Sequence, residues 1–312
     1  MALLGRGAWQ SYPMTENLPY VRETFALRDG PISALRFGDP DAPPRLLFLH
    51  ANGFHAHCYQ RIFAALDCPA IVLDMRGHGQ SQDLPTDVGA LTNWHIFRDD
   101  AIEFAQAHMP KRFVLAGHSF GSVSGILSAP ALTANLAGYV GFDPVTLPAY
   151  FRWVSGFRFW RESFKKRVPI ARNAGRRKSV FDSPEAAFER YQGRGAFRGM
   201  PDEILRDYIE GGLRQVEDGS WHLACDPKWE QAIFAAQHHD LFEAAHALPD
   251  NSRVIYAGKY GAVSTPGLRR ALQRKQPNIS VEFDPELAHL FPLNHPDLAV
   301  KALQSVLDKA VF

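Results

Sequence analysis

A serine between two glycines marks the segment of this 312-residue chain with the clearest capacity for chemistry. Residues 117–121 read GHSFG, with Ser119 at the centre of a G-x-S-x-G pattern. The pattern follows an apolar run at 112–116 and precedes a small-residue, helix-like segment at 122–128. A strand, a sharp turn and a helix in this order lift a serine hydroxyl clear of a sheet, where it can act as a nucleophile. The alternative is an ordinary tight turn with an incidental serine.

A nucleophilic serine needs a base to remove its proton, and a histidine with a pKa near neutrality suits that task. The chain has 13 histidines, so nearness in sequence does not select one. His289 differs from the others because it follows the apolar run at 279–283 and a turn-like Asp284-Pro285 pair. Ligands of parallel sheets bind beyond the carboxyl ends of the strands. His289 is therefore the candidate base.

The elements that must position these groups are short apolar runs separated by helix-like segments. Residues 94–108, for example, repeat apolar side chains at helical spacing. The apolar runs are continuous rather than alternating, which is typical of parallel strands buried on both faces. This order predicts an α/β fold with right-handed crossovers. The expected strands lie at 45–50, 70–74, 112–116, 136–142, 253–257 and 279–283.

The segment 148–248 breaks this alternation. It has no clean strand-like run and many aromatic and cationic residues, so we interpret it as a mostly helical insertion. The predicted core is then 1–147 and 249–312, and 148–248 forms a cap or lid. Residues 150–167 interleave aromatic rings with cations, which predicts a partly buried cap helix with a solvated basic face. An interfacial helix on an anionic membrane surface is the less favoured alternative.

Composition excludes several classes of protein. Lys and Arg number 34 against 33 Asp and Glu, a net charge of +1, whereas a nucleic-acid-binding surface is usually more basic. Three cysteines without a C-x-x-C pair predict free thiols. The sequence shows neither a signal-peptide core nor a membrane span, so we expect a cytoplasmic protein. It also has no zinc-ligand spacing and no G-x-x-x-x-G-K motif, so no metal or cofactor is expected.

Four motifs, in this order and at these separations, resemble those of the α/β-hydrolase superfamily. The resemblance covers most of the chain, from about residue 46 to about residue 306. It implies a mostly parallel central sheet flanked by helices, a helical cap insertion, and a serine hydrolase in which His289 is the base. The motifs are LHANGF at 49–54, DMRGHGQS at 74–81, GHSFG at 117–121 and AHLFP at 288–292.

The resemblance also implies an oxyanion hole, a pair of backbone N–H groups that bind the negatively charged oxygen of the intermediate. One donor is the residue after the nucleophile, Phe120. The other belongs to the loop after His50. Aligning the family's His-Gly pair with His50-Ala51 places this donor at Asn52. Ala51 departs from the family's glycine, which leaves the register open by one residue.

The acid that orients the histidine is harder to place. Most members of the superfamily carry an aspartate after the penultimate strand in a G-x-x-D pattern, but here Gly261 occupies its position. Some members carry the acid one strand earlier, where this chain has Asp143 at the end of another expected strand. We favour a catalytic Asp143, with a turn-forming role as the alternative. Asp284 and Glu286 are weaker candidates, because they share a short loop with the candidate base.

Several nearby side chains are interpreted as structural. His118 is expected to pack or hydrogen-bond locally inside the GHSFG turn, and Asp74 to bond backbone amides of the turn at 74–81. His55 and His57 flank the oxyanion loop. We expect them at the surface or behind the site, and a place in the acyl site is the alternative.

The sequence thus predicts a carboxylesterase-like serine hydrolase without a nucleic-acid partner. Its expected substrate is a small-molecule ester or related acyl compound with apolar or aromatic groups. Lactone and carbon–carbon bond hydrolysis use the same constellation and remain alternatives. A further alternative is a non-catalytic small-ligand-binding protein on a hydrolase scaffold, which the glycine at position 261 motivates.

Overall fold

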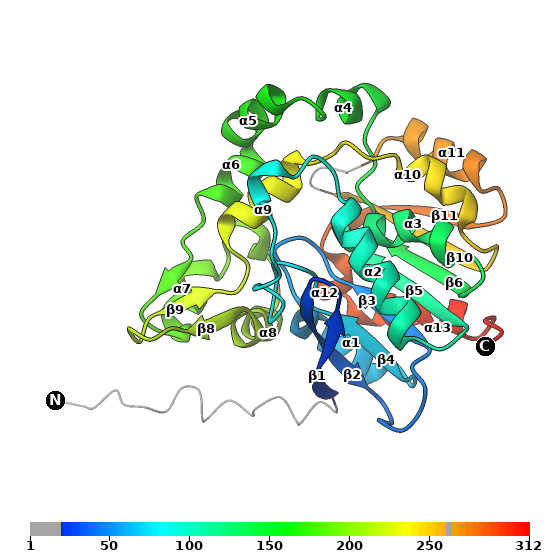
Figure 1. Ribbon diagram of the computed structural model, residues 1–312, viewed down its shortest axis with the longest axis horizontal. Helices are drawn as coiled ribbons and strands as arrows, with labels where there is room; N and C mark the ends of the chain where they lie inside the picture. Colours follow the sequence, from blue (N-terminus) through cyan, green and yellow to red (C-terminus); the bar gives the residue numbers. More distant parts are fainter. Residues whose placement is uncertain (1–19, 260–263) are drawn as a thin grey trace.

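The computed structural model describes residues 20–259 and 264–312 (Figure 1). Within these residues, one sheet of eight strands has the order β1-β2-β4-β3-β5-β6-β10-β11. The strands from β4 to β11 in that order run parallel, and β1 and β2 are antiparallel additions at one edge. The strands are β1 (Tyr20–Leu27), β2 (Gly30–Phe37), β3 (Leu46–Leu49), β4 (Ala70–Leu73), β5 (Phe113–His118), β6 (Leu136–Phe142), β10 (Ser252–Lys259) and β11 (Ser280–Ala288).

The mostly parallel sheet predicted from the apolar runs is confirmed, and all six expected strands are present. The sequence analysis missed the hairpin β1–β2, because its outer strand mixes charged with apolar residues and is half exposed. Arg28 and Asp29 join the two strands, and Gly30, the first residue of β2, has a φ of 140° that favours glycine. The expectation for β11 also needs correction, since this strand continues through Asp284-Pro285 to Ala288 with an irregular register.

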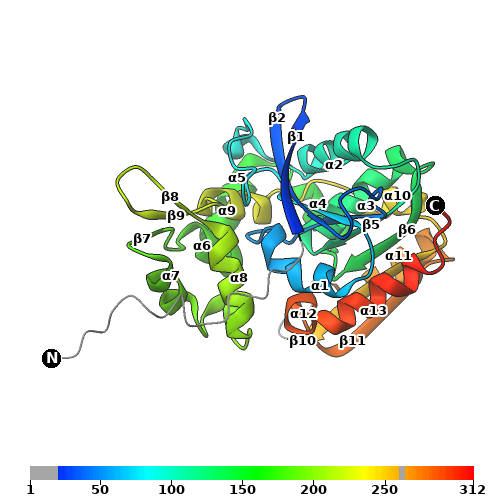
Figure 2. The same ribbon diagram turned by 90° about the horizontal axis from the view of Figure 1, so that it is seen from below.

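Helices cover both faces of the central sheet (Figure 2), and alternate residues of its strands belong to two separate buried cores. Leu46 and Phe48 of β3 share a core with α1 (Gln60–Ala65) and α13 (Pro296–Leu307). Leu47 and Leu49 share a core with α2 (His95–His108) and α3 (Phe120–Leu132). All four side chains are fully buried, as expected for continuous apolar strands between two layers. Two further helices of the core are α11 (Pro266–Lys275) and α12 (Phe291–Asn294).

The segment between β6 and β10 forms a second lobe beside the core, at the left of Figure 1. This lobe is mostly helical, but it also contains a small antiparallel sheet with the order β7-β9-β8. Strands of two or three residues leave no apolar run for a sequence pattern to detect. The elements are α4 (Ala149–Val154), α5 (Arg158–Arg167), α6 (Pro169–Gly175), β7 (Val180–Phe181), α7 (Pro184–Tyr191), η3 (Gly195–Phe197), α8 (Asp202–Gly212), β8 (Leu213–Gln215), β9 (Trp221–Leu223) and α9 (Pro227–Ala235).

The end of the segment returns to the core. The helix α10 (Leu241–Ala244) and the short η4 (Ala245–Ala247) pack against α3. Every helix in the described part of the chain is too short or too polar to cross a bilayer. The three cysteines are buried and unpaired.

Candidate active site

Ser119 lies on a sharp turn between β5 and α3. Its backbone has a φ of 56° and a ψ of −115°, a conformation that L-residues rarely adopt. A Cβ atom on Gly117 would lie 2.6 Å from the carbonyl carbon of Gly121. A Cβ atom on Gly121 would lie 2.2 Å from the carbonyl oxygen of Leu49. The turn therefore needs both glycines, because a side chain at either position would collide with backbone.

The side chains of Ser119, His289 and Asp143 form one hydrogen-bonded chain. His289 Nε2 is 2.8 Å from Ser119 Oγ, and His289 Nδ1 is 2.6 Å from Asp143 Oδ2. The carboxylate keeps a proton on Nδ1, so Nε2 is left to accept the serine proton. Ser119 is 6% exposed and Asp143 is 1% exposed, so water competes little for these contacts. The structure brings together three residues that the sequence analysis selects.

Asp143 has a fixed orientation because two strands hold it. It follows β6 with a φ of 42°, and its N–H group donates to Ile255 O of β10 at 2.7 Å. Its Oδ1 accepts the N–H group of Ala257 at 3.0 Å. The second carboxylate oxygen is then left to face His289.

The other candidate acids lie elsewhere. Asp284 and Glu286 are exposed on β11 rather than in a loop, and Asp284 Oδ1 accepts the N–H group of Glu286 at 2.9 Å. Among the described residues, the carboxylate bonded to His289 is that of Asp143. Gly261, the position at which most of the superfamily carries the acid, lies outside the described residues.

The loop after β3 contains a backbone N–H group for which the described residues supply no backbone acceptor. Ala51 N–H donates to Tyr59 Oη at 3.1 Å, and Gly53 N–H donates to His78 Nε2 at 3.1 Å. Between them, Asn52 N–H has no backbone acceptor within residues 20–259 and 264–312. This group is one of the two oxyanion donors that the sequence analysis selects.

The first turn of α3 supplies the other selected donor. Phe120 is the first residue of the helix, where backbone N–H groups have no intrahelical acceptor. Its ring packs edge-on against Trp94 and Phe97, with centroid distances of 5.1 and 4.7 Å. This packing fixes the backbone of Phe120 beside the serine.

Two neutral histidines hold the loop that carries Asn52. His50 donates from Nδ1 to Ala51 O at 2.8 Å, and its Nε2 accepts Met75 N–H at 2.8 Å. Burial lowers the pKa of His50 to about 4 and that of His78 to about 3. Both rings are therefore neutral near pH 7 and can accept a backbone hydrogen bond.

A buried hydrogen-bond chain links this loop to the candidate base. Tyr59 Oη, which accepts Ala51 N–H, donates to His118 Nδ1 at 2.8 Å. His118 Nε2 in turn donates to the carbonyl oxygen of His289 at 2.8 Å. Burial lowers the pKa of His118 well below its usual value, so the ring stays neutral. The sequence analysis expects only local contacts for His118 and gives no signal for Tyr59, because these partners are distant along the chain.

The remaining residues interpreted as structural are buried behind the loop. Asp74 accepts the N–H groups of Ala56 at 2.8 Å and Gln80 at 3.0 Å, and so stabilises its turn as expected. His55 and His57 are also buried rather than at the surface. A ring nitrogen of His55 lies 3.0 Å from a carbonyl oxygen of α8.

A cavity of about 680 Å³ opens beside His289, between the core and the second lobe. Leu290 and Phe291 line it from the core, together with the charged residues Lys259 and Glu286. Residues of the loop after α7 line the opposite wall. Its size is ordinary for a small-molecule site.

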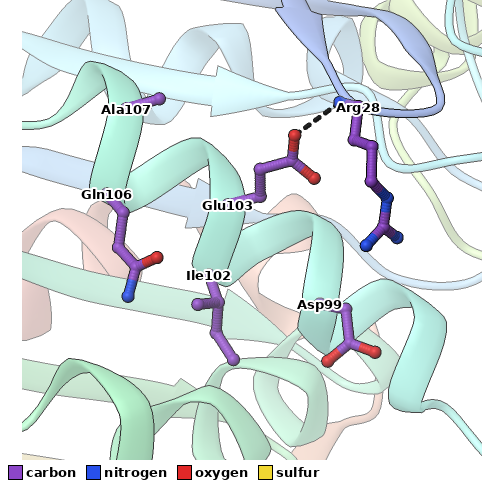
Figure 3. Close-up of a pocket in the computed structure, with 6 residues that line it drawn as sticks. All are labelled: Arg28, Asp99, Ile102, Glu103, Gln106 and Ala107. Atoms are coloured by element: carbon purple, nitrogen blue, oxygen red, sulfur yellow. Dashed lines mark hydrogen bonds between the residues drawn. The ribbon is translucent and has the colours of Figure 1, made fainter.

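A second hollow, of about 490 Å³, lies on the outer face of α2 (Figure 3). The carboxylate of Glu103 accepts the N–H group of Arg28 across it. It contains none of the groups described above, and we assign it no catalytic role. Its lining residues are Arg28, Asp99, Ile102, Glu103, Gln106 and Ala107. Among residues 20–259 and 264–312, no group of three His, Cys, Asp or Glu side chains is placed to hold a metal ion.

Fold and site together define a hydrolase of the α/β type. Residues 46–302 match the model of the alpha/beta hydrolase family, so the chain belongs to that family. Esterase Rv0045c of Mycobacterium tuberculosis is 25% identical over an alignment of 312 positions, which covers 98% of this chain and 95% of the relative.

Solved structures show the same fold. E-2-(acetamidomethylene)succinate hydrolase superposes with a TM-score of 0.74 and 18% identity, covering 93% of this chain and 100% of that chain. A structure of the Mycobacterium tuberculosis esterase superposes with a TM-score of 0.71 and 21% identity, covering 93% of this chain and 92% of that chain.

Proposed function

We propose that this protein hydrolyses a carboxylic ester, or a related acyl bond, through an acyl-enzyme intermediate. Ser119 Oγ attacks the carbonyl carbon while His289 Nε2 accepts its proton, and Asp143 stabilises the resulting imidazolium. The N–H groups of Asn52 and Phe120 bind the oxyanion. The observation that carries the proposal is the chain of contacts at 2.8 and 2.6 Å through His289.

The second half of the reaction uses the same groups in reverse. His289 returns its proton to the leaving alcohol as the bond to the acyl carbon breaks. Water then attacks the acyl-enzyme, gives a proton to His289 and releases the acid, and Ser119 regains its hydroxyl proton. Every proton is exchanged between the substrate, water and the two side chains, so the cycle requires no cofactor.

Residues 148–248 are the proposed cap, and Gly195, Ala196 and Arg198 of this segment line the cavity beside His289. The apolar side chains of Leu290 and Phe291 in that cavity support an apolar or aromatic acyl group in the substrate. The activity named for the Mycobacterium tuberculosis relative supports an ester as the substrate. By contrast, the rings of Tyr150, Trp153 and Phe159 are 70%, 63% and 76% exposed and do not line this cavity.

A chain-length series of p-nitrophenyl esters tests the proposal. We expect measurable turnover, with kcat/KM rising over the first few carbons and falling when the acyl chain exceeds the cavity. Ser119→Ala should lose at least about 10⁴-fold in kcat, because the nucleophile is removed. Ester binding without turnover by the wild-type protein would instead support a non-catalytic ligand-binding role.

A further inference from the structure

The second lobe concentrates positive charge next to the proposed active site. Residues 150–198 contain thirteen Lys and Arg against four Asp and Glu, although the whole chain has a net charge of +1. A cavity of about 550 Å³ lies in this region. The cations that line it are Arg176, Arg177, Lys178, Arg190 and Arg194, and the carboxylate that lines it is Glu230.

The carboxylate is already bound to one of these cations. Arg177 Nη1 lies 2.7 Å from Glu230 Oε2, and both side chains are 13% exposed. The guanidinium also lies over the rings of Tyr191 and Tyr208, at 5.3 and 5.6 Å from their centroids. Arg177 is therefore a buried part of the cavity wall. Because Glu230 is paired with Arg177, its negative charge does not neutralise the other cations of the cavity.

The described part of the chain places no carboxylate beside the cations at the rim. Arg176, Arg190 and Arg194 are exposed, and within the described residues no carboxylate lies within ion-pair distance of them. Like charges around one hollow add their fields, which attracts an anion and raises its local concentration. A planar guanidinium can also donate two parallel hydrogen bonds to a pair of carboxylate or phosphate oxygens, which an ammonium cannot do as well.

This cavity adjoins the one that contains His289. Gly195 and Ala196 line both cavities, so the two cavities meet at this loop. Gly193 and Gly195 have φ values of 67° and 57°, and no atom lies within 4 Å of the position of a Cβ on either. The loop therefore presents open backbone rather than bulky side chains at the junction.

The geometry points to an anion subsite in the cap: Arg190 and Arg194 bind a phosphate or carboxylate group of the substrate, remote from the bond that is cleaved. The inference rests on the proposed function, because it places the reacting carbonyl between Ser119 and His289. A substrate that occupies both cavities is amphipathic. An acyl group fills the apolar part beside Phe291, and a charged group extends past Gly195 into the arginine-lined cavity.

Two matched substrate pairs test the subsite and distinguish the two anions. Butyryl-coenzyme A and S-butyryl-N-acetylcysteamine carry the same thioester with and without phosphates on the leaving group. The mono-p-nitrophenyl ester of glutarate and the p-nitrophenyl ester of pentanoate have acyl chains of equal length with and without a carboxylate. We expect at least a tenfold preference in kcat/KM for the anionic member of one pair, and the pair identifies the anion. Equal kcat/KM within both pairs would overturn the subsite.

Charge variants locate the effect. R190Q/R194Q should lower the preference for the anionic substrate at least tenfold. The control R158Q/K166Q removes two exposed cations of α5 that line neither cavity, and it should leave the preference within twofold of wild type. An equal loss of the anion preference in both double variants would show that the general electrostatic field of the lobe, rather than a binding site, causes the preference. That result would contradict the inference.

Calorimetric titration gives a readout that does not depend on turnover. Coenzyme A and glutarate are titrated into Ser119→Ala, with and without R190Q/R194Q. Binding of one of them that the arginine substitutions weaken at least tenfold supports the subsite. Absence of binding by both contradicts it, while hydrolysis of neutral esters by the wild-type protein would leave the proposed function intact.

Discussion

At the scale of single residues, the proposed catalysis depends on which tautomer His289 adopts. Asn at position 143 can still accept Ala257 N–H through its side-chain oxygen, so Asp143→Asn should fold normally. The amide would donate to His289 Nδ1, which forces the proton onto Nε2 and prevents it from accepting the serine proton. We expect a loss of about 10⁴-fold in kcat with a change below about 1 kcal/mol in unfolding free energy. Turnover near that of wild type would reassign the acid.

A second prediction concerns Tyr59, which connects the oxyanion loop to His118. Tyr59→Phe leaves Ala51 N–H and His118 Nδ1 buried without partners, which should cost about 1–3 kcal/mol of stability. If the chain also positions the base, kcat should fall about tenfold with little change in KM. Tyr139→Phe is the matched control, because its buried hydroxyl bonds Ser122 in the core on the other face of the sheet. A similar drop in kcat in both variants would mean that Tyr59 acts only through stability.

The sequence was sufficient to select the residues that meet at this site, because each stands at the end of an apolar run. Ser119, Asp143 and His289 follow three predicted strands, and parallel strands bring their carboxyl ends to one edge. Tyr59 and Arg177 could not be selected in this way. Tyr59 bonds residues on other elements of the core, and Arg177 bonds Glu230 across the second lobe. These partners are distant along the chain, so no local pattern reveals them.

At the scale of elements, the close approach of α3 to the sheet depends on Gly121. Gly121→Ala would place Cβ 2.2 Å from a backbone carbonyl oxygen that cannot move aside, so we expect destabilisation of about 3 kcal/mol. Gly267→Ala, in the exposed helix α11, is the control. The nearest atom to its Cβ would lie at 3.9 Å, and the substitution should stabilise by about 0.5–1 kcal/mol. Urea denaturation measures both, and equal stability of the two variants would refute the packing argument.

The strands that are buried on both faces of the sheet could be predicted from the sequence. Strands β3 to β6 are continuous apolar runs, and such runs are typical of strands in a parallel sheet that is buried on both faces. The edge strand β1 and the strands β7 to β9 escape such a pattern, because one is half exposed and the others are very short. These strands form because adjacent strands supply hydrogen-bond partners, and their own sequences carry no strand pattern.

At the scale of the whole molecule, buried histidines determine how stability depends on pH. Burial lowers the pKa of His50 and His55 to about 4, and that of His57, His78 and His239 to about 3. Between about pH 6.5, the ordinary value, and pH 4, the unfolded chain binds protons that the folded chain excludes. Stability is therefore greatest above that range and falls on acidification, by up to about 1.4 kcal/mol per pH unit for each histidine.

Buried carboxyl groups oppose this trend, and burial raises the pKa of Asp100 as well as that of Asp207. Burial raises the pKa of Asp207 to about 6, so its protonation on folding gains stability as the pH falls through the same range. We expect these five histidines, together with the buried His118, to dominate, with a urea midpoint clearly lower at pH 5.5 than at pH 7.5. His239→Gln should reduce the difference, whereas His246→Gln, at an exposed position, should preserve it. Equal midpoints at the two pH values would contradict the assignment.

The central claim is that Ser119 is the nucleophile activated by His289. Covalent labelling with a fluorophosphonate, followed by mass spectrometry of the intact protein and its peptides, tests it most directly. We predict a single adduct on the peptide that contains Ser119, and no adduct in Ser119→Ala or His289→Ala. An unlabelled wild-type protein, or an adduct on another residue, would contradict the account.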